Sequence, residues 1–425
     1  MSDTIFAVSS GAAPAAIAVL RISGPDAVAA ATTLAGPLPA ARRAGLRRLR
    51  DEAGALLDSA LVLVFPGPAT ATGEDLVELH LHGGRAIVRA VEDALGRLPG
   101  LRVARPGEFT RRALANGRID LAQAEGLADL LQAETESARR AALAAVDGIV
   151  SGLAHDWTAR LTTLSARTEA LLDFADEDDV PASADAVAGL RSDIAELAGA
   201  LIDAAARPGI ERLRDGIRVV FAGPPNSGKS SLVNALANRE VAIASPIPGT
   251  TRDRIEAPVI RDGVAYVLTD TAGLRASTDD PIEQVGIDRA RQAIDAADVA
   301  IWLGDAAAPH PDMLALHPRA DLPDRTSPGD RLAVSALTGQ GIEQLWDEIG
   351  VRSQSVLSAS DAVAFNRRQR ACIGSAGSVL ATKTDDLLLL AEHLRLARAA
   401  VAEVTGVVGI EAMLDDLFGR FCIGK

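Results

Sequence analysis

One glycine-rich segment carries the clearest chemical signal in the sequence. It runs Gly223-Pro-Pro-Asn-Ser-Gly-Lys-Ser230 and fits the Gly-x4-Gly-Lys-Ser pattern of a phosphate-binding loop. Its backbone amides and the start of the next helix can surround phosphate oxygens, Lys229 can neutralise the β- and γ-phosphates, and Ser230 can ligate magnesium. A chance glycine turn is the alternative, but the segment lies between an apolar run and a helical pattern, as the motif requires.

Two further segments accompany this loop in the order of a nucleotide-dependent switch. Gly249-Thr-Thr-Arg-Asp253 contributes Thr251, whose hydroxyl can reach magnesium only while a γ-phosphate is present. Asp270-Thr-Ala-Gly273 ends an apolar run and can supply a carboxylate to the magnesium shell and a backbone amide to the γ-phosphate. Either motif alone indicates an ordinary loop. Their order and spacing after a phosphate-binding loop predict hydrolysis of a nucleoside triphosphate.

The base is expected to be read by Asp321, because a carboxylate can accept both N–H donors of guanine. Asp321 ends the segment Pro318-Arg-Ala-Asp321, where guanine-binding proteins usually have Asn-Lys-x-Asp. The change removes an amide that braces the loop, and it replaces the stacking lysine stem with that of Arg319. A solvated loop aspartate is the alternative interpretation of Asp321. Residues 335–337, Ser-Ala-Leu, are expected to flank the base.

The water that attacks the γ-phosphate needs an orienting group. Ras-like switches use a glutamine directly after the DxxG motif, and this chain has Leu274 there. We therefore expect Glu283 to orient the water, with an exposed acid at a helix start as the alternative interpretation. Asn226, inside the phosphate-binding loop, can offer a carbonyl oxygen to a monovalent cation beside the phosphates.

Strand-like and helical patterns alternate around these motifs. Apolar runs at 217–222, 265–269, 299–303 and 332–334 are typical of strands, whereas 305–330 is Pro-rich and is expected to be a loop. The alternation predicts an α/β domain with a mostly parallel sheet.

The remaining segments differ in composition from this domain. Residues 1–118 mix short strand-like runs with Gly and Pro, which predicts an α+β domain, and 119–213 and 353–425 are Ala/Leu-rich with helical spacing. The predicted fold class is multidomain α/β and α, with a P-loop (Ras-like) GTPase domain at 214–352 inserted between the two halves of one helical domain.

Composition limits the partners and the compartment. The 425 residues carry a formal charge of −14, so any RNA partner must use a local basic patch or a second protein. No apolar run approaches the ~20 residues that a membrane span needs. Cys372 and Cys422 are too few for a disulfide framework. These features predict a soluble, cytoplasmic protein with no membrane partner.

Four further stretches resemble the MnmE (TrmE) family of tRNA modification GTPases. They are Ala18-Val-Leu-Arg-Ile-Ser-Gly24, Gly73-Glu-Asp-Leu-Val-Glu-Leu-His-Leu-His-Gly-Gly84, Arg105-Pro-Gly-Glu-Phe-Thr110 with Asp120-Leu-Ala-Gln-Ala-Glu125, and Phe421-Cys-Ile-Gly-Lys425. The resemblance implies an N-terminal tetrahydrofolate-binding and dimerisation domain, a central helical domain and a potassium-activated GTPase domain. It also implies a homodimer that joins the flavoprotein MnmG in a heterotetramer. Together they would place a carboxymethylaminomethyl or aminomethyl group on carbon five of the wobble uridine of certain tRNAs.

The resemblance also implies ligands at individual positions. Formyl- or methylene-tetrahydrofolate would contact Arg21, Glu78, Arg118 and the terminal Lys425. Potassium would be held by Asn226, Ser245, Ile247 and Thr250, and magnesium by Ser230 and Thr251. The predicted catalytic residues are Lys229, Thr251, Asp270 and Glu283. The predicted GTP-binding residues are Asn226, Ser227, Gly228, Lys229, Ser230, Ser231, Ser245, Pro246, Ile247, Pro248, Gly249, Thr250, Thr251, Asp270, Thr271, Ala272, Gly273, Asp321, Ser335, Ala336 and Leu337.

Other interpretations remain at this stage. His80 and His82 alternate on one strand without a third metal ligand nearby, so we expect them in the core or in the folate pocket. Cys422 is either a nucleophile or a buried apolar residue. An Era-like ribosome-assembly switch without small-molecule chemistry is the alternative function, but such proteins typically append a basic RNA-binding module, whereas this sequence ends in a helical acidic region and a Cys-Ile-Gly-Lys tail. Asp321 and the two switch motifs weaken a third alternative, an ATPase.

Overall fold

The computed structural model describes residues 3–175, 184–207, 209–238, 241–242, 256–271, 292–323, 329–357, 364–406, 417–419, 421 and 424. The chain divides into two compact units. The first comprises Met1–Ala128 and Ala402–Lys425, and the second comprises Asp129–Val401. Among the described residues, no helix is long and apolar enough to cross a membrane.

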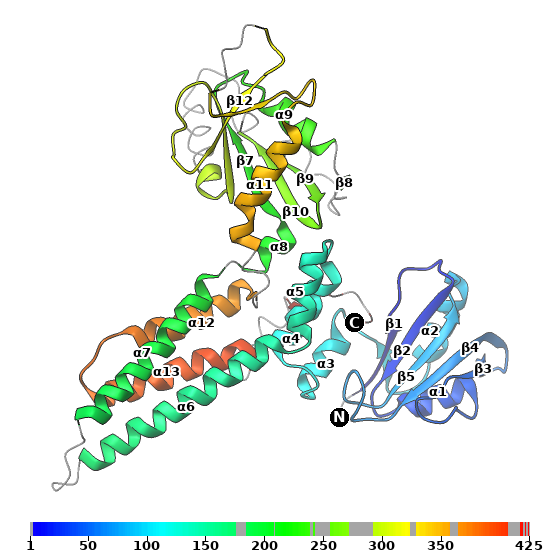
Figure 1. Cartoon of the computed structure of the whole chain (residues 1–425). Coiled ribbons are helices and arrows are strands. Elements are labelled where there is room, and N and C mark those ends of the chain that lie inside the picture. Colours follow the sequence, from blue (N-terminus) through cyan, green and yellow to red (C-terminus); the bar gives the residue numbers. More distant parts are fainter. Residues whose placement is uncertain are drawn as a thin grey trace, which may run out of the picture. The chain divides into compact units, whose positions relative to one another are not determined.

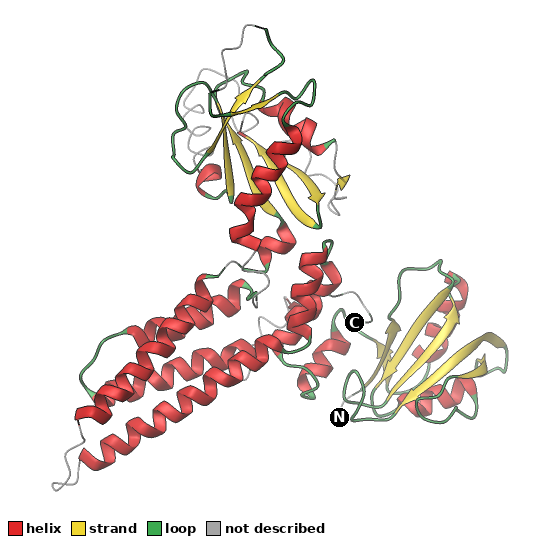
Figure 2. Cartoon of the chain, in the orientation of Figure 1, coloured by secondary structure: helices red, strands yellow, loops and turns green. Residues whose placement is uncertain are grey.

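The first unit is built on a six-stranded sheet with the order β3-β4-β5-β2-β1-β6 (Figures 1 and 2). Neighbouring strands are antiparallel, except that β1 and β6 are parallel. One face is buried, as the alternation of buried and less buried residues along β4 and β5 shows. The elements are β1 Thr4–Val8, β2 Ile17–Ser23, α1 Ala27–Ala35, β3 Gly45–Arg50, β4 Leu56–Phe65, β5 Leu76–His82, α2 Arg85–Gly96, β6 Leu101–Val103, α3 Glu108–Ala115 and α4 Leu121–Gln132.

Helices α1 and α2 contribute to the core on the buried face of this sheet. Leu20 and Ile22 of β2 point into it, so Arg21 between them lies on the opposite face. The chain end returns to this unit, because Phe418 and Phe421 pack with Ala128. The predicted α+β character of the N-terminal region is confirmed.

The second unit contains a seven-stranded sheet, which in the sequence follows one group of helices and precedes another. Its order is β13-β12-β11-β7-β10-β9-β8, with the strands from β13 to β10 parallel and β9 and β8 antiparallel at one end. The elements from the sheet onward are β7 Ile217–Ala222, α9 Lys229–Ala237, β8 Val241–Ala242, β9 Glu256–Arg261, β10 Val264–Asp270, β11 Val299–Leu303, β12 Leu314–Pro318, β13 Leu332–Val334 and α11 Ile342–Leu357.

Helices that precede the sheet in the sequence pack against helices that follow it. They are α5 Glu136–Val146, α6 Ile149–Ala175, α7 Ala184–Ala206 and α8 Glu211–Asp215 before the sheet, and α12 Arg367–Ala381 and α13 Leu387–Thr405 after it. Helix α7 contacts both α6 and α12 (Figure 1). A Cβ atom on Gly377 of α12 would lie 2.9 Å from the Ile202 side chain of α7, so the two helices approach closely. An inserted α/β domain within a helical region is therefore confirmed.

One expectation for the sheet was wrong. Residues 305–330 were expected to be a loop, but β12 lies within this segment and pairs with β11 on one side and β13 on the other. Leu316 of β12 is fully buried. Parallel pairing on both sides stabilises a five-residue strand whose flanking prolines indicated a loop.

Candidate functional site

The phosphate-binding loop connects the central strand β7 to helix α9. Strand order reverses at β7, with β11 on one side and β10 on the other, and ligands of open α/β sheets bind at such points beyond the carboxyl ends of the strands. Gly223 has a φ of +153°, and a Cβ atom there would lie 2.5 Å from the Leu303 carbonyl oxygen. Gly228, with a φ of +95°, caps α9. Both positions therefore need glycine.

Lys229 folds its side chain into this loop. Lys229 is 5% exposed, and its Nζ donates to the carbonyl oxygens of Gly223 at 3.0 Å and Pro224 at 2.8 Å. The ammonium thus lies on the inner side of the loop, at the start of α9, where phosphate oxygens can replace these carbonyls as acceptors.

The two described magnesium-ligand candidates meet beside this lysine. Ser230 begins α9 and Asp270 ends β10, and the Ser230 hydroxyl donates directly to an Asp270 carboxylate oxygen. Asp270 is 1% exposed, and the next residue, Thr271, anchors the strand end by donating to the Phe221 carbonyl at 2.8 Å. Two hard oxygen donors at contact distance fit magnesium, which favours one or two protein oxygens together with substrate phosphates.

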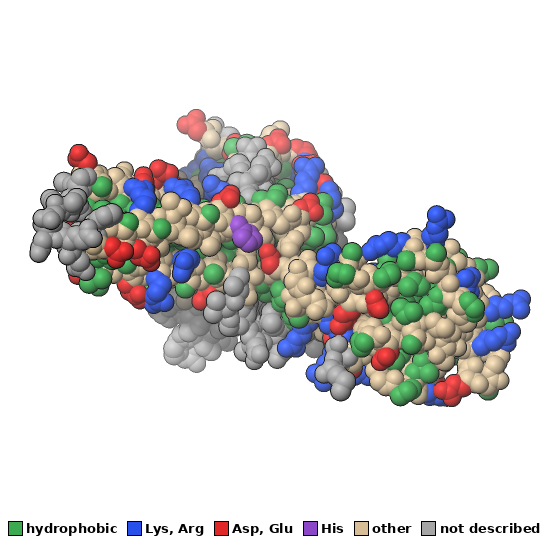
Figure 3. Space-filling model, turned by 90° about the horizontal axis from the view of Figure 1, so that it is seen from below, with side chains coloured by type: hydrophobic (Ala, Val, Ile, Leu, Met, Phe, Trp, Pro, Cys, Tyr) green, Lys and Arg blue, Asp and Glu red, His purple; other side chains and the backbone are tan. Residues whose placement is uncertain are grey.

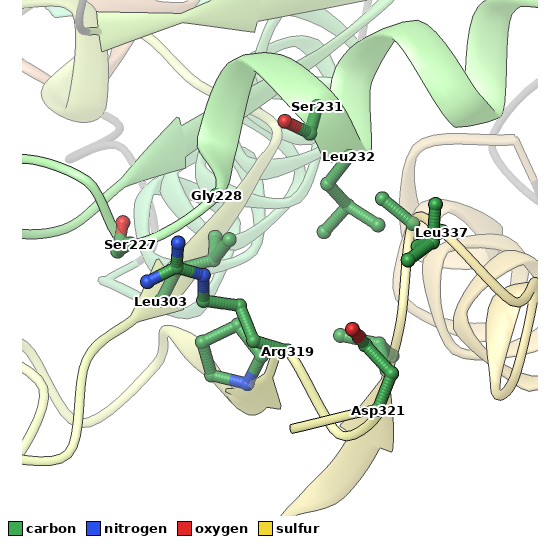
Figure 4. Close-up of a pocket in the computed structure, with 11 residues that line it drawn as sticks. Ser227, Gly228, Ser231, Leu232, Leu303, Arg319, Asp321 and Leu337 are labelled. Atoms are coloured by element: carbon green, nitrogen blue, oxygen red, sulfur yellow. The ribbon is translucent and has the colours of Figure 1, made fainter.

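A cavity of about 150 Å³ opens next to the loop (Figure 4). In that view the Asp321 carboxylate faces the cavity, and the Arg319 side chain extends from the same loop toward the phosphate-binding loop. Arg319 adopts a φ of +60°, and its Cγ would lie 3.7 Å from a Cβ atom on Gly228. Its stem therefore lies where a planar base can stack. The lining residues are Ser227, Gly228, Ser231, Leu232, Leu303, Pro318, Arg319, Asp321, Val334, Ala336 and Leu337.

Asp321 is held by a residue that follows the next strand. The Ser335 hydroxyl donates to Asp321 Oδ1 at 2.5 Å, and Ser335 is fully buried. The Thr338 amide donates to the Ser335 hydroxyl oxygen at 3.1 Å, and the Ala320 amide donates to the Val334 carbonyl at 3.1 Å. The loop that was expected to lose its brace through Pro318 is therefore braced by Ser335.

Sequence reasoning missed the apolar wall of this cavity. Leu232, Leu303 and Val334 line it and were not predicted. Each is an ordinary core residue in sequence, so its type carried no signal. Leu303 and Val334 end β11 and β13, and the carboxyl ends of parallel strands line the ligand site of such sheets. Their place at strand ends was the one feature from which a role in the cavity wall could have been predicted.

Several predicted site residues lie outside the described residues. They are Ser245, Pro246, Ile247, Pro248, Gly249, Thr250, Thr251, Ala272, Gly273, Leu274, Glu283, Cys422 and Lys425. Their predicted roles remain predictions.

A second cluster of predicted ligands lies on the open face of the N-terminal sheet. Arg21 and Glu78 are cross-strand neighbours on β2 and β5, and Arg21 Nε donates to Glu78 Oε1 at 2.8 Å. Burial raises the pKa of Glu78, but hydrogen bonds from Arg21 and His80 outweigh it and keep that pKa below its ordinary value. An ionised carboxylate beside a guanidinium fits the amide and amino edge of a pterin and its acidic tail.

The other folate candidates are not joined to this pair by a described contact. Arg118 Nε donates to the Thr70 carbonyl at 3.1 Å, in the loop before β5. The chain end lies beside β1, because the Ser9 hydroxyl donates to the Gly424 carbonyl at 2.6 Å. This contact brings the residue before Lys425 to the N-terminal sheet.

The two histidines of β5 are not core residues. The His80 ring contacts Glu78 at 3.2 Å, and the largely exposed His82 ring contacts Asp58 at 2.7 Å. Among the described residues, no group of three His, Cys, Asp or Glu side chains could hold a metal ion. Of the two expected positions, the structure excludes the core for the exposed His82, whereas a place in the folate pocket stays a prediction for both histidines.

Comparisons with known proteins cover nearly the whole chain. A family model described as "GTP-binding protein TrmE N-terminus" matches residues 4–118, and one described as "MnmE helical domain" matches residues 121–422. The G domain of the Thermotoga maritima FeoB iron transporter aligns at 22% identity over 32% of this chain and 99% of that chain. Its TM-score is 0.25.

Curated relatives align from end to end. The tRNA modification GTPases MnmE of Erythrobacter litoralis and Methylobacterium sp. are 54% and 51% identical to this chain, each over 100% of both sequences. That of Zymomonas mobilis is 48% identical over 99% of this chain and 100% of its own length. The chain therefore belongs to the MnmE (TrmE) family of tRNA modification GTPases.

Proposed function

We propose that this chain hydrolyses GTP to drive a folate-dependent modification of carbon five of the wobble uridine in certain tRNAs, together with the flavoprotein MnmG. Membership of the family supports a GTP hydrolase acting in tRNA modification. The observation that carries the GTPase part is the convergence of Lys229, the Ser230–Asp270 pair and the Asp321 cavity at the carboxyl edge of one parallel sheet.

Each of these groups has one task in hydrolysis. Lys229 neutralises the β- and γ-phosphates, Ser230 and Asp270 hold magnesium, and Asp321 accepts the two N–H donors of guanine. Magnesium, when bound, supplies positive charge to the phosphate oxygens. The phosphate-binding loop lies against β11 with no room for a side chain at Gly223, so the nucleotide's phosphates bind to a fixed main chain.

Potassium activation is proposed on two features of this chain. Leu274 occupies the place of the water-orienting glutamine, and Asn226 projects from the loop at a φ of +60°, a conformation that asparagine tolerates. Hydrolysis should rise when sodium is replaced by potassium at equal ionic strength, and Asn226→Ala should remove the difference. Equal parent rates in both salts contradict potassium activation and leave the nucleotide site unaffected. Glu283→Ala tests the proposed water-orienting residue in the same assay.

Folate binding is proposed at the Arg21–Glu78 pair. Calorimetric titration of the full chain with formyl-tetrahydrofolate should show binding that Arg21→Ala and Glu78→Ala both weaken. Arg97→Ala is the matched control, because Arg97 is an exposed arginine that ends α2, on the helix-covered side of the sheet. Unchanged affinity in both site variants would show that the folate contacts lie elsewhere.

A homodimer through the open face of the N-terminal sheet completes the proposal. This face exposes Leu46 and Leu61, which are paired neighbours on β3 and β4, at 65% and 44%, and Ile17 of β2 at 57%. Exposed large apolar side chains on one sheet face are typical of a protein interface. Light scattering should give twice the chain mass, and Leu46→Glu with Leu61→Glu should shift the protein to monomer. A monomeric parent protein contradicts the dimer.

The proposed modification has a direct test in cells. Mass analysis of wobble uridines should show loss of the modification when the gene is deleted and recovery when it is restored, but not with Asp270→Asn. Unchanged uridines together with defective ribosome assembly would favour the Era-like alternative.

A further inference from the structure

An edge strand of the N-terminal sheet is unusually basic. Five of the nine residues from 42 to 50 are arginine, in a chain whose formal charge is −14. They belong to β3 and the loop before it, and β3 is the first strand in the sheet order, so one side of it pairs with no other strand in the described part of the chain. Four of the five are exposed and one is half-buried. We call Arg42, Arg43, Arg47, Arg48 and Arg50 the arginine edge.

The arginine edge keeps its positive charge. Of the described acidic side chains, none forms an ion pair with it, whereas Arg21, Arg102 and Arg112 of the same unit all do. Its hydrogen bonds go to main-chain carbonyls: Arg42 donates to Ala69, Arg47 to Pro37 and Leu46, and Arg50 to Gly54. Carbonyl acceptors hold side chains in place without neutralising them.

This charge exceeds what protection of an edge strand needs. Charged side chains along a free edge deter pairing with another chain. That role explains arginines within β3, but it does not explain arginines outside the strand. Arg42 and Arg43 precede β3, and Arg42 also lies over the Phe65 ring at 5.7 Å. In Figure 3, basic side chains stand along the outer rim of the α+β lobe, and its central face is mostly hydrophobic or uncharged.

The dimensions of the arginine edge fit a nucleic-acid backbone. A six-residue strand extends ~20 Å, which is long enough to lie beside several successive phosphates of a nucleic-acid backbone. The guanidinium group is planar and binds phosphate oxygens in pairs. Successive side chains of a strand point to opposite faces, so Arg47 and Arg48 lie on opposite faces of β3, while Arg42 and Arg43 precede the strand. The arginine edge thus presents several guanidinium groups along and before one short strand, a length over which a backbone offers several phosphates.

We propose that the arginine edge binds the phosphodiester backbone of RNA, and that it is the local patch by which this acidic chain holds its tRNA. The inference rests on the proposed function, since that function requires a tRNA ligand. The contact is to backbone phosphates alone, so it should not depend on the nucleotide sequence.

The test compares two double variants of the full chain. Arg43→Gln with Arg48→Gln removes two charges of the arginine edge that make no described hydrogen bond with their side chains. Arg139→Gln with Arg140→Gln is the matched control, because it removes two exposed arginines of α5 that pair with Glu136. Fluorescence anisotropy measures the affinity for an unmodified tRNA transcript at several salt concentrations.

The expected result is quantitative. Each lost phosphate contact lowers the slope of log affinity against log salt by about 0.7 to 0.9, so the edge variant should lose about 1.5 in slope and about tenfold in affinity at 0.2 M salt. The control should bind like the parent, and GTP hydrolysis without RNA should be equal in all three proteins. Equal slopes and affinities in the edge variant and the parent overturn the inference, as does a parent chain that fails to bind the transcript.

Two other outcomes also overturn it. A changed oligomeric state in light scattering with unchanged RNA affinity would assign the arginine edge to contacts between copies of the chain. Lost retention of the partner flavoprotein with unchanged RNA affinity would assign it to an acidic protein surface. Neither outcome bears on the proposed function, which the wobble-uridine analysis tests separately.

Discussion

Replacement of Asp321 by asparagine should change which base the chain binds. In the parent, Asp321 Oδ1 accepts the Ser335 hydroxyl at 2.5 Å while the carboxylate faces the cavity. In Asp321→Asn, the only acceptor for the Ser335 hydroxyl proton is the asparagine carbonyl oxygen. The asparagine NH2 group then faces the cavity, toward the substituent on carbon two of the base. Guanine presents a donor there and xanthine presents an acceptor. Asp321→Asn should therefore lose GTP and gain xanthosine triphosphate.

The size of the effect follows from the charge on the lost acceptor. A hydrogen bond to a charged group contributes about 1.5 to 3 kcal/mol, and about 1.4 kcal/mol corresponds to tenfold in affinity. Asp321→Asn should thus weaken GTP binding by about ten- to a hundredfold. Because Ser335 fixes the side-chain orientation, the preference for xanthosine triphosphate should be of similar size.

The assay is a competition between the two nucleotides, measured as the ratio of their dissociation constants. Ser335→Ala in the Asp321→Asn background should reduce the new preference, because the amide is then free to rotate. Asp312→Asn is the matched control, since Asp312 is an exposed aspartate that does not line the cavity. An unchanged ratio in Asp321→Asn would refute the assignment and place guanine recognition on another residue.

Three further predictions concern the supports of the two units. Ser335→Ala alone should weaken GTP binding by about three- to tenfold, as expected for about 1 kcal/mol of lost hydrogen bonding, and calorimetry with GDP checks it. Gly223→Ala should cost about 1 to 3 kcal/mol of unfolding free energy through its clash with a β11 carbonyl, whereas Gly152→Ala, with open space around it, should not destabilise the chain in urea titrations. Burial raises the pKa of Glu108, but the hydrogen bonds from Arg102 and the Arg105 amide, together with the charges of Arg102 and Arg112, outweigh burial and lower the net pKa. The stabilisation by Glu108 should therefore be present at neutral pH and be lost as the pH falls below about 4, and Glu108→Gln should flatten this acid dependence in thermal melts.

Local sequence was sufficient for the nucleotide-binding loop and for four of the seven strands in the sheet of the second unit. The loop's conformation depends on glycine at fixed positions between a strand and a helix, and these are short-range features. The apolar runs at β7, β10, β11 and β13 were also visible, because parallel strands covered on both faces are almost continuously hydrophobic.

Strands β9 and β12 could not be identified in the same way. Strand β9 has the sequence Glu-Ala-Pro-Val-Ile-Arg and pairs only in antiparallel fashion near the sheet edge, where polar residues and proline are tolerated. Strand β12 is short and lies among prolines. Both strands are stabilised by hydrogen bonds to neighbouring strands in the sheet. A local sequence pattern does not show which strands will be neighbours.

The sequence by itself determined the phosphate-binding loop and a family resemblance along the whole chain, and it predicted one acid for magnesium and one for guanine. Only the tertiary structure decided which side chains support one another. Ser230 meets Asp270 forty residues away, and Ser335 reaches back fourteen residues to hold Asp321. Such contacts depend on the order and register of strands in a sheet, and that order is set by burial of the whole core rather than by any segment of the chain.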